Sequence, residues 1–421
     1  MMRECRFMLR DTAVWVWLAL AFVFSVTAVT LGMSEISQQR SELAELYKFD
    51  KIERDVALSD QTDWGSAAYY TFHLTSDPPS DFAFAAIGQR DVSPWKHRIR
   101  MLALEGQIYE TDSNNPDFAL IGRFDFAFVA TLLAPLLVIL LLFDLRSGEQ
   151  AGGRLRLIEA SATNPKTLWR MRAALRVGCL AVALCLPLII GALLSGTSIV
   201  TLLFCILALI LYFIFWAWLT MVLTPAIRTW AYNLTVMLGV WLLIGAIIPA
   251  TLAQTIESAV PLPDGGDIVL TQREAVNDAW DIPKNESYDP FMARHPEWAD
   301  FTVWESDAFE WKWYYAFQQV GDQTVEPLSL GYREGRRKRD QLALWSSVIS
   351  PATAMQRCLE YLAKTDMKAA MDYEQSVREF HTELRNWHYP RLFKDQPFEA
   401  DSAKIELSKF IGETYEERAN D

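Results

Sequence analysis

Long stretches of apolar residues alternate with long polar regions along this chain. Five of these stretches contain no charged residue: Thr12–Met33, Phe126–Phe143, Val177–Ser195, Ile199–Leu223 and Trp230–Ala253. Each is close to the roughly 20 apolar residues that a helix needs to cross a hydrocarbon core about 30 Å thick. The pattern therefore predicts an all-α polytopic membrane bundle of five spans, which carries two mixed, mostly helical polar regions.

The first apolar stretch has to be distinguished from a cleavable signal peptide. It is longer than the roughly 7–15 apolar residues of a signal core. The polar residues after it, Ser34–Ser59, place Ile36, Leu43 and Leu46 at helical spacing. We therefore expect an uncleaved span that continues beyond the membrane as an amphipathic helix.

Composition narrows the class of protein. The 421 residues include 39 basic and 52 acidic side chains, for a formal net charge of −13, and 51% of the chain is hydrophobic. The acidic balance argues against nucleic-acid binding, which requires a basic surface. The concentration of the apolar residues in five blocks excludes a soluble enzyme. Only Cys358 lies outside the head and the spans, so no disulfide is expected within the outer regions.

The short basic segments predict the orientation of the chain in the membrane. Residues 144–176 carry seven basic and three acidic residues, the head carries Arg3, Arg6 and Arg10, and Arg228 lies between the last two spans. Basic residues in short loops favour the inner side. We expect the N-terminus inside and both acidic regions outside. This orientation divides the chain into a head with the first span (1–33), an outer insertion (34–123), the second span (124–143), an inner loop (144–176), spans three to five (177–253) and an outer C-terminal domain (254–421).

Four further features of the chain have a structural interpretation. Pro135, Pro187 and Pro249 lie inside spans, where we expect packing kinks with neighbouring helices binding the freed carbonyls. The aromatic run Trp304–Tyr315 is expected to be core or a membrane-interface belt. Gln341–Lys394 is expected to be helical, with a helix start at Ser350-Pro351. A basic cluster is expected to form a solvated helix face, with lipid headgroup contact as the alternative; it consists of Arg333, Arg336, Arg337, Lys338 and Arg339.

The sequence contains no motif for catalysis of its own. It has no G-x-x-x-x-G-K-[ST], H-E-x-x-H, C-x-x-C or G-x-S-x-G, and its five histidines are scattered through the outer regions. We expect no catalytic residue, no cofactor and no metal site.

The inner loop is the most informative segment. Leu155, Leu157 and Ile158 are expected to form an apolar ridge that a partner could bury. Arg154, Arg156 and Glu149 would provide a charged rim, and Gly152-Gly153 would allow a sharp turn before it. The alternative is an interfacial amphipathic anchor with ordinary inner-side charge.

The same loop carries a family resemblance. It resembles the D…E…G-x-L-x-L…P…L…K run after the second span of type-2 ABC transporter (ABC-2 type) permeases, and the matching residues are Asp144, Glu149, Gly153, Leu155, Leu157, Pro165, Leu168 and Arg172. Arg3-Glu4 and Arg10-Asp11 are similar to the head of that class. The outer stretches around Pro78-Pro79-Ser80 and Gly122–Asp125 resemble the permeases with a large periplasmic insertion that are labelled multi-copper enzyme maturation permeases. Such permeases usually have six spans, whereas this sequence predicts five. The segment Leu342–Cys358, a candidate for the sixth, is too short and too polar to span.

The resemblance implies a function and a set of partners. It implies the permease subunit of an ATP-driven transporter in the bacterial inner membrane, paired with a second permease copy or relative. Two cytoplasmic ABC ATPase subunits would bind the loop at Glu149, Gly153, Arg154–Ile158 and Pro165, and a periplasmic protein is a further partner. The alternative is a non-transporting membrane subunit that passes ATPase work to a periplasmic partner. A third interpretation, a membrane-anchored periplasmic enzyme, lacks a catalytic constellation.

Overall fold

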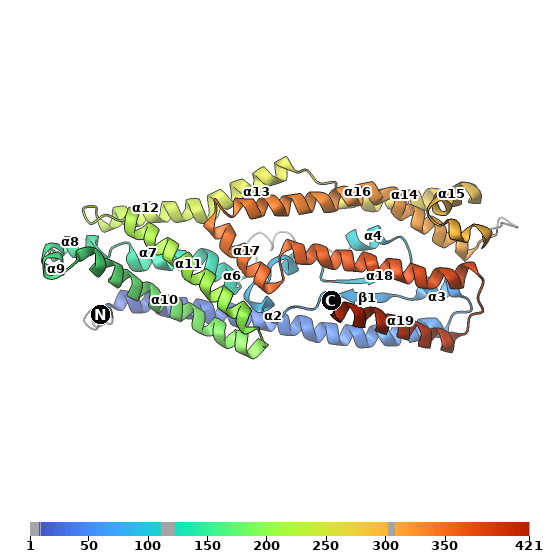
Figure 1. Ribbon diagram of the computed structural model, residues 1–421, viewed down its shortest axis with the longest axis horizontal. Helices are drawn as coiled ribbons and strands as arrows, with labels where there is room; N and C mark the ends of the chain where they lie inside the picture. Colours follow the sequence, from blue (N-terminus) through green and yellow to red (C-terminus); the bar gives the residue numbers. More distant parts are fainter. Residues whose placement is uncertain (1–7, 9, 111–122, 302–307, 421) are drawn as a thin grey trace.

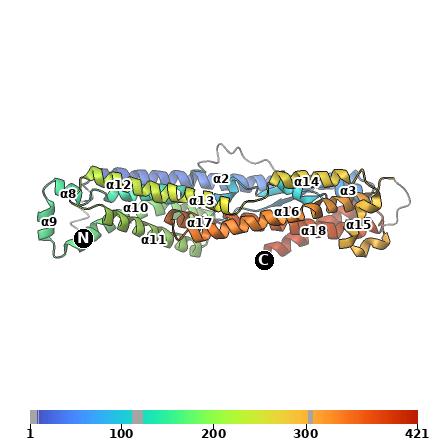
Figure 2. The same cartoon turned by 90° about the horizontal axis from the view of Figure 1, so that it is seen from above.

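Most of the long helices run along the axis of a long rod (Figure 1), and the same arrangement is visible from above (Figure 2). The computed structural model describes residue 8 and residues 10–110, 123–301 and 308–420. The predictions that involve Arg3, Glu4, Arg6, Gly122 and Trp304 lie outside the described residues.

Among the described residues, five helices are long and apolar enough to cross a membrane: Thr12–Ser59, Phe126–Ala151, Pro165–Ser195, Ile199–Leu223 and Trp230–Ala259. The five predicted spans are therefore confirmed as helices. In order, the elements are α2 (Thr12–Ser59); α6 (Phe126–Phe128), the π-helical turn η3 (Val129–Leu133), α7 (Ala134–Leu142) and α8 (Ser147–Ala151); α10 (Pro165–Ser195); α11 (Ile199–Leu223); and α12 (Trp230–Leu242), the π-helical turn η4 (Leu243–Ile247) and α13 (Ile248–Ala259). Together with α9 (Leu155–Ser161) and residues 12–33 of α2, the elements α6–α13 form what we call the apolar half.

One boundary differs from the sequence prediction. Residues 165–176, which we expected in the loop, form the first three turns of α10. The Asn164 side chain accepts a hydrogen bond from the Thr167 amide at 3.3 Å, and Pro165 occupies the first turn. Both features favour a helix start at this point, so the third span begins earlier than its uncharged stretch.

Two of the three prolines in the spans follow π-helical turns, whereas Pro187 lies inside the regular helix α10. The turns η3 and η4 end two residues before Pro135 and Pro249. A proline leaves the carbonyl four residues earlier without its donor. For Pro135 that carbonyl belongs to Thr131, and it accepts a hydrogen bond of 2.9 Å from the Tyr212 hydroxyl of α11. For Pro135, the expected packing role is thus supported by a contact between spans.

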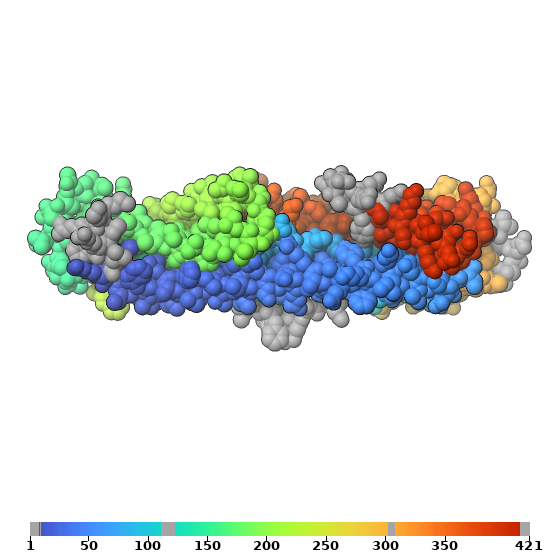
Figure 3. Space-filling view, turned by 90° about the horizontal axis from the view of Figure 1, so that it is seen from below, coloured from blue at the N-terminus to red at the C-terminus, as the bar shows by residue number. Residues whose placement is uncertain are grey.

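Helix α2 extends along most of the molecule (Figure 3). Its 48 residues correspond to about 72 Å at 1.5 Å per residue, and the predicted continuation through Ser34–Ser59 is confirmed. A buried segment, Phe82–Ile87, packs against it. The contact is close, because a Cβ added at Gly32 would lie 2.0 Å from the Phe84 carbonyl oxygen.

The remaining elements form what we call the polar half, which extends from the middle of the rod to the end opposite α8 and α9 (Figure 1). They are α3 (Trp64–Tyr70), β1 (His73–Ser76), η1 (Ala83–Ala85), η2 (Gly88–Asp91), β2 (Lys96–Ile99), α4 (Leu104–Tyr109), α14 (Gly265–Asp278), α15 (Lys284–Arg294), η5 (Pro296–Phe301), α16 (Trp311–Ser346), α17 (Pro351–Ala363), α18 (Met367–Phe393) and α19 (Ala400–Asn420). Strands β1 and β2 pair antiparallel, with His73 opposite Ile99.

The two polar regions of the sequence pack against each other. The Tyr373 hydroxyl donates to the Thr75 carbonyl at 3.1 Å, and the Leu104 amide donates to the Asp322 carboxylate at 2.7 Å. In the described part of the aromatic run, Trp313 and Tyr315 are buried in the core, which agrees with the core alternative.

Helix α17 joins the two halves. Ser350 caps it at the predicted start, with its hydroxyl accepting from the Thr353 amide at 3.2 Å. Its buried residues Met355, Leu359 and Ala363 belong to the same apolar core as the spans. The helix has 13 residues, or about 20 Å, so it packs against the spans without being long enough to cross a membrane.

The prediction for the basic cluster is wrong for Arg336. Arg337 and Lys338 are exposed on α16, as a solvated face requires. Arg336 is instead buried and forms an ion pair of 2.5 Å with Glu374 of α18. Because successive residues of a helix point in different directions, a run of charges along the sequence cannot share one face.

Candidate functional site

The segment predicted to bind an ATPase forms one end of the rod, where α8 and α9 lie beyond the spans (Figure 1). Gly153 makes the turn between the two helices with φ of +70°, and no atom lies within 4 Å of an added Cβ. Residues other than glycine rarely adopt this left-handed conformation. The positive φ therefore favours glycine at this position, although there is space for a side chain. The predicted turn at Gly152-Gly153 is confirmed.

Ion pairs and hydrogen bonds fix α8 and α9 to the third span. The Glu149 carboxylate lies 2.8 Å from Arg154 and 3.3 Å from Arg172 of α10. The Trp169 indole of α10 donates to Glu159 of α9 at 3.1 Å. A displacement of α8 and α9 would therefore act directly on α10, which packs along α2.

The predicted ridge does not form one exposed face. Leu155 is buried, Ile158 packs against the same core, and Leu157 is 74% exposed. Residues three apart share a helix face, whereas residues two apart do not, so Leu157 projects away from the other two. Leu157 is the apolar side chain of α9 that a partner could cover, and the exposed Arg154 and Arg156 flank it.

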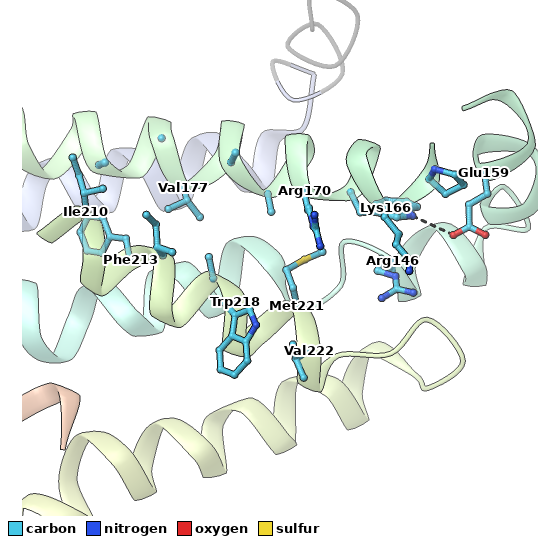
Figure 4. Close-up of a pocket in the computed structure, with 18 residues that line it drawn as sticks. Arg146, Glu159, Lys166, Arg170, Val177, Ile210, Phe213, Trp218, Met221 and Val222 are labelled. Atoms are coloured by element: carbon cyan, nitrogen blue, oxygen red, sulfur yellow. Dashed lines mark hydrogen bonds between the residues drawn. The ribbon is translucent and has the colours of Figure 1, made fainter. Parts of the chain in front are cut away.

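A groove of about 890 Å³ lies beside this end, between α10 and α11 (Figure 4). Apolar side chains line most of its length. They include Val177, Ile210, Phe213, Ile214, Trp218, Met221 and Val222.

Polar side chains gather at the end of the groove nearest α9 (Figure 4). Arg146, Lys166 and Arg170 line it together with Glu159, whose carboxylate accepts the hydrogen bond from Trp169. Among the described residues, none of these three cations has an ion-pair partner. The Nε of Arg146 is buried and has no hydrogen-bond partner there.

A second pocket, of about 740 Å³, lies where the two halves meet. Its walls come from α13, α16, α17 and α18 and from the segment that contains η2. They hold the Arg336–Glu374 pair and an Arg357–Asp340 pair of 2.9 Å. The pocket therefore contains both acidic and basic side chains, most of which already form ion pairs.

Glu360 of α17 lines this second pocket and has a perturbed acidity. Burial raises the pKa of its carboxyl to about 7, and the nearby Asp125 acts in the same direction. A hydrogen bond of 2.8 Å from Gln356 and the charge of Arg357 oppose the shift without cancelling it. The group can therefore change its charge near neutral pH, at the junction of the two halves.

Four of the five histidines of the polar half are buried, namely His73, His97, His381 and His388. Burial lowers the pKa of His97 to about 4 and that of His388 to about 3, so both rings are neutral at pH 7. Within the described ranges, no group of three His, Cys, Asp or Glu side chains could hold a metal ion.

The structure brings together some of the predicted site residues and adds others. Glu149, Arg154 and Gly153 form one turn, and Pro165 lines the groove. Sequence reasoning missed Trp169 and the cationic end of the groove. The pair Lys166 and Arg170 could have been recognised from the sequence, because residues four apart lie on one face of a helix. Arg146 could not, because only the tertiary structure places it beside these two residues.

The comparisons with known proteins concern mainly the polar half. Residues 268–404, from within α14 to the beginning of α19, are similar to a family described as a domain of unknown function (DUF3526). No curated protein and no solved structure matches the chain.

Proposed function

We propose that this chain is the permease subunit of an ATP-driven ABC transporter in a bacterial inner membrane. The end formed by α8 and α9 would lie in the cytoplasm and bind the ATPase subunits, and the polar half would lie in the periplasm. The observation that carries the proposal is the exposed Leu157, flanked by two arginines on a segment fixed to a span by Glu149 and Glu159. An apolar contact with a charged rim is the usual design of a specific docking site.

The decisive experiment charges this contact. Leu157→Asp should abolish co-purification of the ATPase subunits from native membranes and lower ATP turnover, because a buried contact would acquire an unpaired charge. Arg156→Ala should weaken binding only slightly. Ile405→Asp is the matched control, since Ile405 is 72% exposed at the opposite half of the molecule. Wild-type co-purification and turnover for Leu157→Asp would refute the docking role.

The orientation is tested separately. Cysteine introduced at Arg156 should react with a membrane-impermeant maleimide only in opened cells, whereas cysteine at Ser402 should react in cells whose outer membrane alone is permeabilised. Both positions are exposed, so accessibility reports the side of the membrane. The reverse pattern would place α8 and α9 outside and exclude an ATPase contact.

A non-transporting membrane subunit is the second candidate, and one observation favours it. Helix α2 is unbroken from the apolar half into the polar half, so it could transmit ATPase work mechanically. The two functions differ in whether water reaches the spans. Cysteines at exposed span positions such as Leu207 and Leu211 should become accessible to a hydrophilic reagent during turnover in a permease. They should stay inaccessible in a subunit that only transmits force.

A further inference from the structure

The groove between α10 and α11 combines features that one class of ligand would satisfy. At its end nearest α9 are three cations, against one carboxylate that is already hydrogen-bonded. None of the three cations has an ion-pair partner among the described residues. Anionic oxygens form strong, charge-assisted hydrogen bonds with Arg and Lys, so this end of the groove suits an anionic oxygen ligand.

The rest of the groove is apolar and open. Gly178 of α10 lies on its wall, and an added Cβ there would meet no atom within 4 Å. Ile214, Trp218 and Val222 of α11 are 57%, 60% and 57% exposed. This wall would be unstable in water and suits a hydrocarbon chain.

The dimensions of the groove fit one leaflet of a bilayer. Between Arg170 and Ala181, both of which line it, α10 rises about 16 Å. Half of a hydrocarbon core about 30 Å thick is about 15 Å. A lipid whose headgroup lies at Arg170 would therefore extend its acyl chain to the inner end of the groove.

We propose that this groove binds one anionic phospholipid of the surrounding bilayer, with its phosphate at Arg146, Lys166 and Arg170 and an acyl chain along α10 and α11. The site is independent of the proposed transport function, because it requires only that the apolar half lies in a membrane. A bound lipid would rest against Trp169, which holds α9 through Glu159, so lipid occupancy would stabilise the position of the α8–α9 segment.

A second copy of the chain is a weaker candidate for the occupant. A symmetric contact places the same patch of both copies together. Here it would bring two sets of three cations into one apolar interface, where like charges repel strongly. An anionic lipid headgroup neutralises the same charges.

The test measures lipid retention by the full chain. The purified protein is reconstituted in nanodiscs of equal parts dioleoylphosphatidylglycerol and dioleoylphosphatidylcholine, released, and analysed by native mass spectrometry. We expect one retained phosphatidylglycerol, preferred over phosphatidylcholine by about tenfold or more, since each basic residue near an anionic surface contributes to binding. Equal retention of the two lipids would overturn the proposal.

Two variants address the two ends of the site. Arg146→Gln with Lys166→Gln should remove the preference for phosphatidylglycerol, whereas Arg228→Gln, an exposed cation between α11 and α12 and outside the groove, should leave it unchanged. Gly178→Phe should fill the apolar wall and reduce retention, whereas Gly239→Phe, equally uncrowded but on α12, should not. Unchanged retention in either groove variant would refute the site. Loss of a dimer in Gly178→Phe with lipid retention intact would identify the groove as a contact between copies instead.

Discussion

The polar half buries charges in pairs, whereas the apolar half leaves large apolar side chains uncovered. In the polar half, Arg378 donates two hydrogen bonds to Glu105, at 2.8 and 2.9 Å, and Arg385 pairs with Asp322 at 2.7 Å. In the apolar half, the most apolar window of the span Phe126–Ala151 is 67% buried, but that of Trp230–Ala259 is only 6% buried.

The difference reflects what surrounds each half. Removing a charge from water costs free energy, so a buried ion pair in the polar half is stable only if its two side chains meet with accurate geometry. Such pairs therefore favour one arrangement of α4, α16 and α18. Lipid solvates hydrocarbon as well as a protein interior does, so the spans gain little by covering their outer faces. The polar half is therefore a tightly specified body, and the faces of α10, α11 and α12 remain available to lipid or to other subunits.

The largest effect is expected from breaking a buried pair. Arg378→Met should destabilise the protein by about 3–5 kcal/mol, because the Glu105 charge is left buried and alone. Glu105 is ionised in this pair. Burial alone would raise the pKa of its carboxyl, but the hydrogen bonds and the charge of Arg378 outweigh burial and lower that pKa. Thermal unfolding of the full chain in detergent measures the loss.

Two controls accompany this substitution. Arg378→Met combined with Glu105→Leu should recover most of the stability, since no charge is left unpaired. Arg273→Met removes an exposed pair with Glu110, where both side chains are 57% exposed, and should cost about 0–1 kcal/mol. Equal losses for Arg378→Met and Arg273→Met would show that the polar half does not depend on buried charge.

Acid should destabilise the polar half through its buried histidines. Burial, and then the charge of Arg391, lower the pKa of His388 to about 3. In the unfolded chain the ring titrates near pH 6.5, so between pH 6.5 and 3 only the unfolded state binds the extra proton. The free energy of unfolding therefore decreases as the pH falls, by roughly 3 kcal/mol at pH 4. His388→Phe should raise the melting temperature at pH 4 and change it little at pH 7.5. An identical acid profile would contradict this role.

The junction of the halves should respond to pH in the opposite direction. The folded-state pKa of Glu360, about 7, lies above its ordinary value of 4.5. The folded state therefore holds the proton more tightly, and stability falls as the pH rises from 4.5 to 7, by up to roughly 3 kcal/mol. Glu360→Gln should melt at a higher temperature than the wild type at pH 8 and at about the same temperature at pH 5. A wild-type profile in the variant would show that Glu360 is solvated.

The smallest effects compare the inside and the outside of the apolar half. Gly32→Ala should cost about 1–3 kcal/mol, because its Cβ would clash with the Phe84 carbonyl and separate α2 from the buried segment Phe82–Ile87. Gly239→Ala, in open space on α12, should be neutral or stabilising by up to about 1 kcal/mol. Melting curves of both variants in the same detergent provide the comparison, and equal destabilisation would mean that the α12 face is covered.

The sequence by itself determined the elements of the fold, because their causes are local. An uncharged run as long as a bilayer is thick predicts a span, and Ile199–Leu223 is a helix with the predicted bounds. The start of α17 follows from a capping serine and a first-turn proline. The turn at Gly153 follows from a residue type that tolerates positive φ. Each of these depends only on residues within a few positions of one another.

The tertiary structure decided which of these residues face a partner. The sequence placed Leu155, Leu157 and Ile158 on one ridge, but packing against the spans buries Leu155, partly buries Ile158 and leaves Leu157 exposed. It placed Arg336 in solvent, but Glu374, 38 positions away, pairs with it inside the protein. Neither Arg146 nor Glu360 carries a local signal of its environment. Burial and charge pairing depend on segments far apart in the chain, and only the packed helices bring those segments together.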